Sequence, residues 1–267
     1  MLGLKRLLSQ RHTIHHARNL SKLEDKLLPV ISFRDPSQWS SKRFLDIYQF
    51  GNKEAIEKER ARLKDEMNRG YFADISEMKQ HGGKIAMANK IIVPAMTAMK
   101  FPATEVSYPD GISIKLPITS ENANTAKSDA PKASVLCLSF RASSQVMVDS
   151  WSMPFLDAFG QSKSVQLYEV SFIDSWLLTR NPIKKILLRI MRKSKPAERN
   201  NVVQPQIVYS FGDHYDFRKE LKILNLLTGY IYLIDKLGRI RWQGSGFATP
   251  DELSSLLSCT SFMLEEK

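Results

Sequence analysis

The stretch that decides the fold lies near the C-terminus. Residues 229–246 read GYIYLIDKLGRIRWQGSG. Residues 230–234 combine aromatic, aliphatic and β-branched side chains, which is the composition of a buried strand. Residues 235–238 supply a turn, with Gly238 where left-handed backbone is needed, and residues 239–242 alternate between polar and apolar. The stretch therefore predicts a β-hairpin.

The residues around this hairpin predict a mixed sheet with helices. Residues 134–140 and 165–173 have the composition of strands. Apolar residues at 148, 151, 155 and 159 have helical spacing, and further helical stretches fall at 182–193 and 217–227. A last helix is expected from Thr249, which can cap its N-terminus, with Glu252 at the capping-box position. Helices that connect successive strands imply a parallel portion, to which the hairpin adds an antiparallel edge. We expect an α/β fold with a mixed sheet flanked by helices.

This order of elements, with LIDKLGRI in the hairpin, resembles the thioredoxin-like fold. Redox members of that superfamily carry two cysteines after the first strand and a cis-proline at the entry to the hairpin. Aligned on this chain, the cysteine positions fall at Gln145 and Val148 and the proline position at Gly229, so none of the three is kept.

The chain has two cysteines, Cys137 and Cys259. Cys137 lies inside an apolar strand, which predicts a buried structural thiol and not a stabilised thiolate. A search for a phosphate-binding glycine loop, a serine nucleophile elbow or zinc-ligand spacing finds none of them. We therefore expect a protein that is not an enzyme and that has no catalytic residues, cofactor or metal.

Charge is concentrated in two places. The formal net charge is +11, of which residues 1–23 contribute five cations and residues 180–195 seven, both without an acid, so the remaining chain sums to −1. A nearly neutral body does not indicate a general nucleic-acid-binding protein.

The first basic segment predicts a mitochondrial targeting signal. Residues 1–20 lack acids and combine leucines, hydroxyl residues and arginines, as mitochondrial transit peptides do. Cleavage is expected near Leu20 and Ser21, and a disordered basic tail is the alternative.

A second region, residues 21–118, is predicted to form a helical and irregular N-terminal arm. Residues 53–69 predict a charged helix, and a second helix is expected to end at Gly82-Gly83. Residues 84–101 are rich in Met and Ala, which predicts core packing, with an adaptable surface for an apolar partner as the alternative. Residues 108–116 alternate between polar and apolar, which predicts a short exposed strand or an extended segment. Residues 119–131 read as a flexible linker before a thioredoxin-like domain at 132–267.

Two residue groups in these regions have more than one interpretation. His81 is either a general base or ligand, or simply a polar residue before the glycine pair. The second basic segment predicts an amphipathic helix with Ile183, Ile186, Leu187, Ile190 and Met191 on one face. Such a helix is typical of membrane-surface or partner binding, although packing on the sheet with solvated cations explains the same pattern. The flanking cations, predicted as membrane- or partner-binding residues, are Lys184, Lys185, Arg189, Arg192 and Lys193.

A family resemblance rests on motifs in order along the chain: YFADI (71–75), HGGK (81–84), FP (101–102), GYIYLID (229–235), RW (241–242), GSG (244–246) and ATPDE (248–252). Together with the basic N-terminus they resemble the mitochondrial ATP synthase assembly factors of the inner membrane that attend newly made subunit a (subunit 6). The resemblance implies a non-catalytic, chaperone-like protein on the matrix side of the inner membrane, with subunit a of the Fo sector as its partner. A thiol- or copper-handling thioredoxin-like protein of mitochondria and a mitochondrial RNA-binding protein are the alternatives.

Overall fold

The structure of the chain is a computed structural model that describes residues 53–68, 72–81, 83–119, 131–174, 181–193 and 204–266. The chain divides into two compact units between Tyr71 and Phe72. In the first unit the described part is α2 (Lys53–Asn68), which confirms the helix predicted there. The transit peptide and its cleavage position lie outside the described residues.

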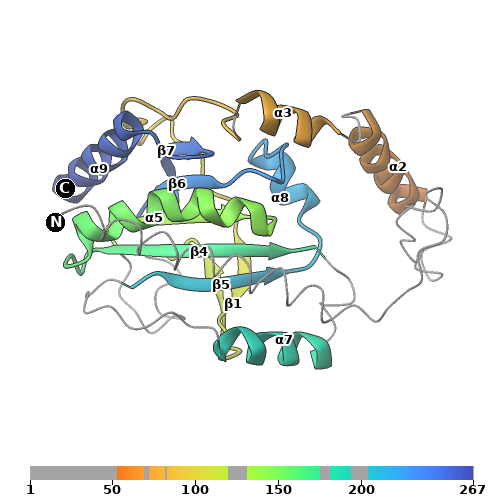
Figure 1. Ribbon diagram of the computed structural model, residues 1–267. Helices are drawn as coiled ribbons and strands as arrows, with labels where there is room; N and C mark the ends of the chain where they lie inside the picture. The colour runs from red at the N-terminus through yellow and green to blue at the C-terminus, as the bar shows by residue number, and fades with distance from the viewer. Residues whose placement is uncertain are drawn as a thin grey trace, which may run out of the picture. The chain divides into compact units, whose positions relative to one another are not determined.

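The second unit is built on a seven-stranded sheet with the order β2-β1-β5-β4-β3-β6-β7 (Figure 1). Strands β3, β4 and β5 are parallel, and β6 and β7 form the predicted antiparallel hairpin beside β3. The strands are β1 (Thr104–Ser107), β2 (Ser113–Leu116), β3 (Ala133–Ser139), β4 (Val165–Ile173), β5 (Gln206–Phe211), β6 (Tyr230–Asp235) and β7 (Ile240–Ser245).

Helices cover the sheet because its central strands are apolar on both faces. The residues of β3 alternate between two core clusters, with Val135 and Cys137 in one and Leu136 and Leu138 in the other. α5 (Gln145–Phe159) and α9 (Pro250–Glu265) pack on the first face. The other helices among the described residues are α3 (Ala73–His81), the short 3-10 helix η3 (Ala142–Ser144), α7 (Asn181–Lys193) and α8 (Tyr215–Glu220).

This arrangement is a thioredoxin-like fold, as the sequence predicted. The units β3-α5-β4 and β6-β7-α9 follow the expected order. Gly238 has φ +79 in the hairpin turn. Thr249 and Glu252 form the capping box at the start of α9. These features were predictable because each depends on residues that are neighbours in sequence.

The helix predicted at 217–227 is shorter in the structure, because α8 ends at Glu220. Lys222 has a positive φ of 54°, which is incompatible with a continuing right-handed helix. Asn225 is buried and its side-chain amide donates to the Asp74 carbonyl, 3.1 Å away, and to Glu77 Oε2, 2.8 Å away. Contacts with α3 thus hold the segment that the local sequence pattern assigned to a helix.

The N-terminal arm also differs from its prediction. Its residues 108–116 were expected to form one short strand, but the hairpin is made by β1 and β2, with a turn between them at Gly111, φ +94. β1 pairs with β5 through Ser107 and Tyr209, so the hairpin extends the same sheet. The chain from Phe72 onward therefore belongs with the thioredoxin-like domain, and the compact units divide at residue 71, not at the predicted linker, whose residues 120–130 lie outside those described.

Candidate functional site: a closed thioredoxin-like site and a basic helix

The three positions aligned with the redox residues of thioredoxin-like proteins lie together. Gln145 is the first residue of α5, and Val148 is buried in its first turn. Gly229 lies just before β6, where an added Cβ would be 3.2 Å from Val148 Cγ2 and 3.3 Å from the Ser144 carbonyl oxygen. The structure therefore has the redox site of the fold in the predicted place, with an amide, an isopropyl group and a glycine in it.

Gln145 connects two carboxylates at this site. Its Nε2 atom donates to Asp149 Oδ1 at 3.0 Å and to Glu169 Oε2 at 3.3 Å. Burial, and after it the negative charge of Asp149, raises the pKa of Glu169, although hydrogen bonds from Ser152 and Gln145 oppose the shift. The site thus holds a polar cluster beside the place of the missing cysteines.

The segment after α3 closes over the first turn of α5. Gly83 has φ +83, a backbone conformation that strains any residue with a side chain, and a Cβ there would lie 2.5 Å from Met147 Cε, so the Met147 side chain would have to move. Thr228 Oγ1 donates to the Gly83 carbonyl at 2.9 Å. The backbone at Gly246 approaches from the other side, since a Cβ on it would lie 2.6 Å from the same carbonyl oxygen. Met147 is thus buried beneath the segment after α3, and Val148 is buried beside Gly229.

Both cysteines are buried, as predicted for Cys137. Burial, with the charges of Glu169 and Asp149 added, raises the pKa of Cys137 well above its ordinary value. Burial also raises the pKa of Cys259, against a hydrogen bond from Ser255. Because the thiolate is the reactive form of cysteine, these environments disfavour thiol chemistry.

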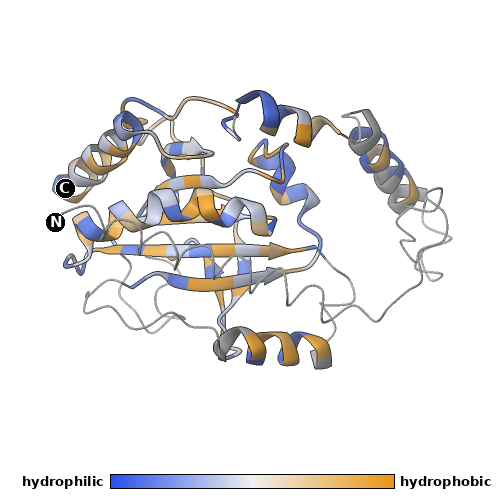
Figure 2. Cartoon of the chain, in the orientation of Figure 1, coloured by the Kyte–Doolittle hydropathy of each residue, from blue (hydrophilic) through white to orange (hydrophobic). Residues whose placement is uncertain are grey.

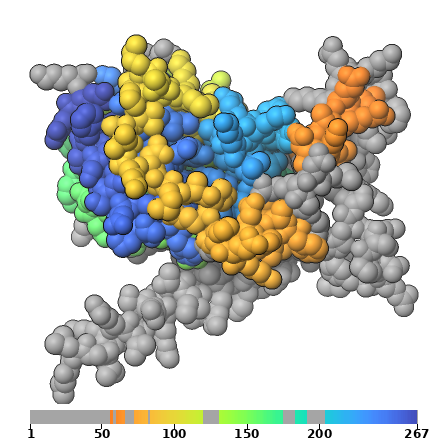
Figure 3. Space-filling view, turned by 90° about the horizontal axis from the view of Figure 1, so that it is seen from above, coloured from red at the N-terminus to blue at the C-terminus, as the bar shows by residue number. Residues whose placement is uncertain are grey.

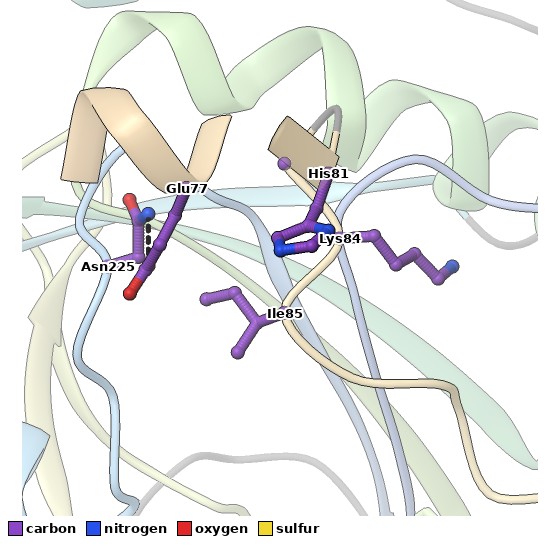
Figure 4. Close-up of a pocket in the computed structure, with 6 residues that line it drawn as sticks. Glu77, His81, Lys84, Ile85 and Asn225 are labelled. Atoms are coloured by element: carbon purple, nitrogen blue, oxygen red, sulfur yellow. Dashed lines mark hydrogen bonds between the residues drawn. The ribbon is translucent and has the colours of Figure 1, made fainter. Parts of the chain in front are cut away.

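A pocket of about 190 Å³ opens beside α3. Figure 4 shows Glu77 joined to Asn225 by a hydrogen bond of 2.8 Å, while the Lys84 side chain extends away from both. The exposed side chain of His81 lies at this pocket, and no cluster of three His, Cys, Asp or Glu side chains able to hold a metal is found in the described parts of the chain. The pocket is lined by Glu77, His81, Gly83, Lys84, Ile85 and Asn225.

Sequence reasoning missed a Ser–His–Asp cluster in which Ser210 and His214 are buried and Asp174 is exposed. His214 Nδ1 lies 2.5 Å from Asp174 Oδ1, and His214 Nε2 lies 2.9 Å from Ser210 Oγ. The Ser210 hydroxyl donates to the Glu105 carbonyl at 2.9 Å and the residue is 2% exposed, so it is not presented to a substrate. The cluster links β1, β4 and β5 to the start of α8. No spacing motif marks it, because its members join only when β4 and β5 pair.

The pKa of Asp174 reflects its contact with His214. Burial alone would raise its pKa, but the hydrogen bond and charge of His214, with the charges of Arg218 and Arg141, hold the pKa below the ordinary value of 3.8. The ring of Phe172 packs edge-on against His214, with 4.7 Å between ring centroids. We conclude that the cluster has a structural role and holds the start of α8 to the sheet.

The basic helix forms as predicted, but its buried side differs from the predicted stripe. Leu187 and Leu188 are buried, whereas Ile186 is 57% exposed. Lys184 is half-buried, with Nζ 5.0 Å from the centre of the Phe211 ring. Polar and apolar residues alternate along α7 (Figure 2). Among the predicted binding residues Lys185 and Arg189 are exposed, while the side chains of Arg192 and Lys193 lie outside the described part.

The Met-rich segment is the clearest error, because core packing was predicted for it. Met87, Met96 and Met99 are 72%, 95% and 58% exposed. The segment runs along β7, where the amide of Val93 donates to the Arg241 carbonyl at 2.7 Å. It lies on the surface against the C-terminal strands and helix (Figure 3). Its backbone thus covers the edge of β7, and its methionines point outward.

Comparison with known proteins gives the family. The chain matches the ATP10 protein family over residues 10–263. It belongs to this family. A search of the curated proteins finds no match for this ATP10-family chain.

Among solved structures, the chain is similar to a putative thiol:disulfide interchange protein DsbE from Chlorobium tepidum, with 16% identity, 62% of this chain and 96% of that chain covered, and a TM-score of 0.38. It is also similar to BsSco, a member of the Sco family of cytochrome c oxidase assembly proteins, with 13% identity, 67% and 100% covered, and a TM-score of 0.40. Structural similarity with TM-scores of 0.38 and 0.40 supports no conclusion about function.

Within this ATP10-family chain, the burial of the thiols and the exposure of apolar side chains are the features that bear on function. In the first turn of α5, Met147 and Val148 are buried, and both thiols are buried as well. Nowhere in the part of the chain that the structure describes is a helix both long and apolar enough to cross a bilayer. Exposed apolar side chains occur on the methionine segment and on the outer side of α7, among other places.

Proposed function

We propose that this protein is a non-catalytic, chaperone-like assembly factor for the membrane Fo sector of mitochondrial ATP synthase. It binds newly made subunit a (subunit 6) at the matrix face of the inner membrane. Membership of the ATP10 protein family supports a role in ATP synthase assembly. The observation that carries the proposal is the thioredoxin-like site, in which Gln145 and Val148 take the cysteine positions and Gly83 packs against Met147.

The exposed methionine segment is the surface we assign to the client. Methionine side chains are unbranched and polarizable, so they adapt to irregular apolar partners. Met87, Ile91 and Met96, 72%, 77% and 95% exposed, project from a backbone that hydrogen bonds hold along β7. A surface of this kind suits the apolar segments of an unassembled membrane subunit, which need cover until their neighbours arrive.

The targeting of the protein to mitochondria is part of the same proposal. Residues 1–20 act as a mitochondrial transit peptide, and cleavage near Leu20 and Ser21 releases the mature chain into the matrix. The mature protein then meets subunit a where that subunit is inserted into the inner membrane.

Crosslinking in mitochondria that translate their own genes tests this function. Labelled nascent products are crosslinked, and the protein is captured under denaturing conditions through a tag. Subunit a is expected as the main labelled adduct. Capture of another mitochondrial product in its place, or of mitochondrial RNA without a labelled protein, would contradict the proposal.

A further inference from the structure

The outer side of α7 has a composition that its packing leaves unexplained. Leu187 and Leu188 face the body, and Lys184 lies over the Phe211 ring, so these residues are used in packing. The helix contains no acidic residue in its sequence NPIKKILLRIMRK. Two cations, Lys185 and Arg189, remain exposed one helical turn apart.

An apolar side chain is exposed between these cations. Ile186 is 57% exposed and follows Lys185 directly, while Ile190 is partly buried one turn further on. Cations beside an exposed aliphatic group are the composition of helices that lie in the headgroup region of a bilayer, where the cations meet phosphates and the apolar group enters the acyl boundary.

We propose that the outer side of α7, formed by Lys185, Ile186 and Arg189, binds the anionic lipid headgroups of a membrane surface. This inference rests on the packing of α7 and stands whether or not the client is subunit a. Attachment is peripheral and reversible, because two cations and one partly inserted isoleucine give modest affinity.

A partner groove and a nucleic acid are less suitable occupants. A helix that docks in a protein groove needs apolar anchors over successive turns, and two of the apolar residues of α7, Leu187 and Leu188, are already buried against the body. A nucleic-acid backbone would pair with Lys185 and Arg189 but has no apolar site for Ile186. Anionic lipid satisfies both kinds of side chain.

Flotation of the full-length protein with lipid vesicles tests the proposal. Vesicles of phosphatidylcholine alone are compared with vesicles that also contain cardiolipin, over a salt series. The unaltered protein is expected on the anionic vesicles, with partitioning that falls as salt is added. The double variant Lys185→Gln with Arg189→Gln is expected to partition about thirty-fold more weakly, at the usual contribution of a cation near an anionic leaflet. Ile186→Ser is expected to lose about tenfold.

The matched control removes the same charge elsewhere on the same unit. Lys163 and Lys236 are both exposed and lie outside α7, so the double variant Lys163→Gln with Lys236→Gln should partition like the unaltered protein. Equal thermal unfolding of all variants shows that the fold is kept. Undiminished partitioning of the α7 double variant, an equal loss in the control, or binding to RNA in place of vesicles overturns the proposal.

The flotation and crosslinking experiments fail separately. A protein that floats with anionic vesicles but captures no subunit a retains the α7 inference and loses the proposed client. A protein that captures subunit a but ignores lipid does the reverse.

Discussion

Two glycines from distant parts of the chain meet where the N-terminal segment closes the thioredoxin-like site. Gly246 has φ +70, and a Cβ on it would lie 2.6 Å from the Gly83 carbonyl oxygen. A substitution at Gly246 therefore meets both backbone strain and a clash with main-chain atoms, which no rotamer change relieves.

We predict that Gly246→Ala lowers the free energy of unfolding by about 3 kcal/mol, as expected for combined strain and overpacking. Urea denaturation of the purified protein measures this. Gly111→Ala is the control, because Gly111 also has a positive φ of 94° but nothing lies within 4 Å of its added Cβ. The control should lose about 1 kcal/mol. Equal losses would show that the close approach to Gly83 contributes nothing.

Glu252 joins the same segment to the start of α9. Its carboxylate accepts hydrogen bonds from the Ala88 amide at 2.9 Å and the Thr249 amide at 3.2 Å, and it pairs with Lys84. Burial alone would raise its pKa, but Lys84, Ala88 and Thr249 hold the pKa below the ordinary value of 4.5. The charged carboxylate thus stabilises the fold above pH 4.5, and this contribution is lost as the pH falls through the lowered pKa.

We predict that Glu252→Gln lowers the free energy of unfolding by about 2 kcal/mol at pH 7, the usual value for hydrogen bonds to a charged group. The difference from the unaltered protein should shrink as the pH falls below 4.5, since protonation then removes the same charge. Chemical denaturation at a series of pH values follows this. Glu265→Gln, at an exposed position of the same helix, is the control and should change little. A difference that stays constant with pH would contradict the assignment.

The contacts of single residues were predictable from sequence only where the two partners are close along the chain. Thr249 and Glu252 form a recognisable capping pair, and Gly238 lies in a recognisable turn. The contact of Gly83 with Gly246 and the contact of Asp174 with His214 join residues that are far apart in sequence. No local pattern encodes either of these contacts, so both became visible only in the fold.

At the scale of elements, the methionine segment gives the most direct prediction. Replacing Met87, Ile91 and Met96 together by serine should leave the unfolding free energy within about 0.5 kcal/mol, because exposed side chains contribute little to stability. The yield of crosslinks to nascent subunit a should fall severalfold, because the apolar contact surface is lost. Crosslinking in isolated mitochondria measures the yield.

The control for this variant uses two other exposed apolar residues. Ile112 and Leu237, 60% and 43% exposed, lie in hairpin turns outside the segment. Ile112→Ser with Leu237→Ser should retain the crosslinks. Loss of crosslinks in this control, or their retention in the triple variant, would remove the methionine segment from the client surface.

Local patterns predicted the existence of most elements but not always their burial. The apolar run of β3, the alternation of β4 and the cap of α9 identified these elements correctly. In α7 the period of the helix was right, but the buried side includes Leu188 and leaves Ile186 exposed. Which side of a helix is buried depends on the surface that it meets, and here that surface is the end of β5. The methionine segment was misjudged for the same reason, because apolar composition alone does not say what lies against it.

At the scale of the whole molecule, the central claim is that a thioredoxin-like body has kept its architecture and works by binding. The order of strands and helices was predictable because β3-α5-β4 and the β6-β7 hairpin each have a strong pattern. The extension of the sheet by β1 and β2 was not predictable, because a strand of four residues gives little periodic signal.

The most direct test removes all thiol chemistry from the chain. Cys137→Ala with Cys259→Ala leaves no cysteine, and because both thiols are buried we expect a loss of stability of about 2 kcal/mol with the fold retained. Cells whose only copy carries both substitutions are examined for assembled ATP synthase by native electrophoresis. The account predicts the normal amount of assembled ATP synthase in these cells. Gln145 and Val148 are left unchanged in this variant. Loss of the assembled enzyme from cells that contain the folded cysteine-free protein would contradict it.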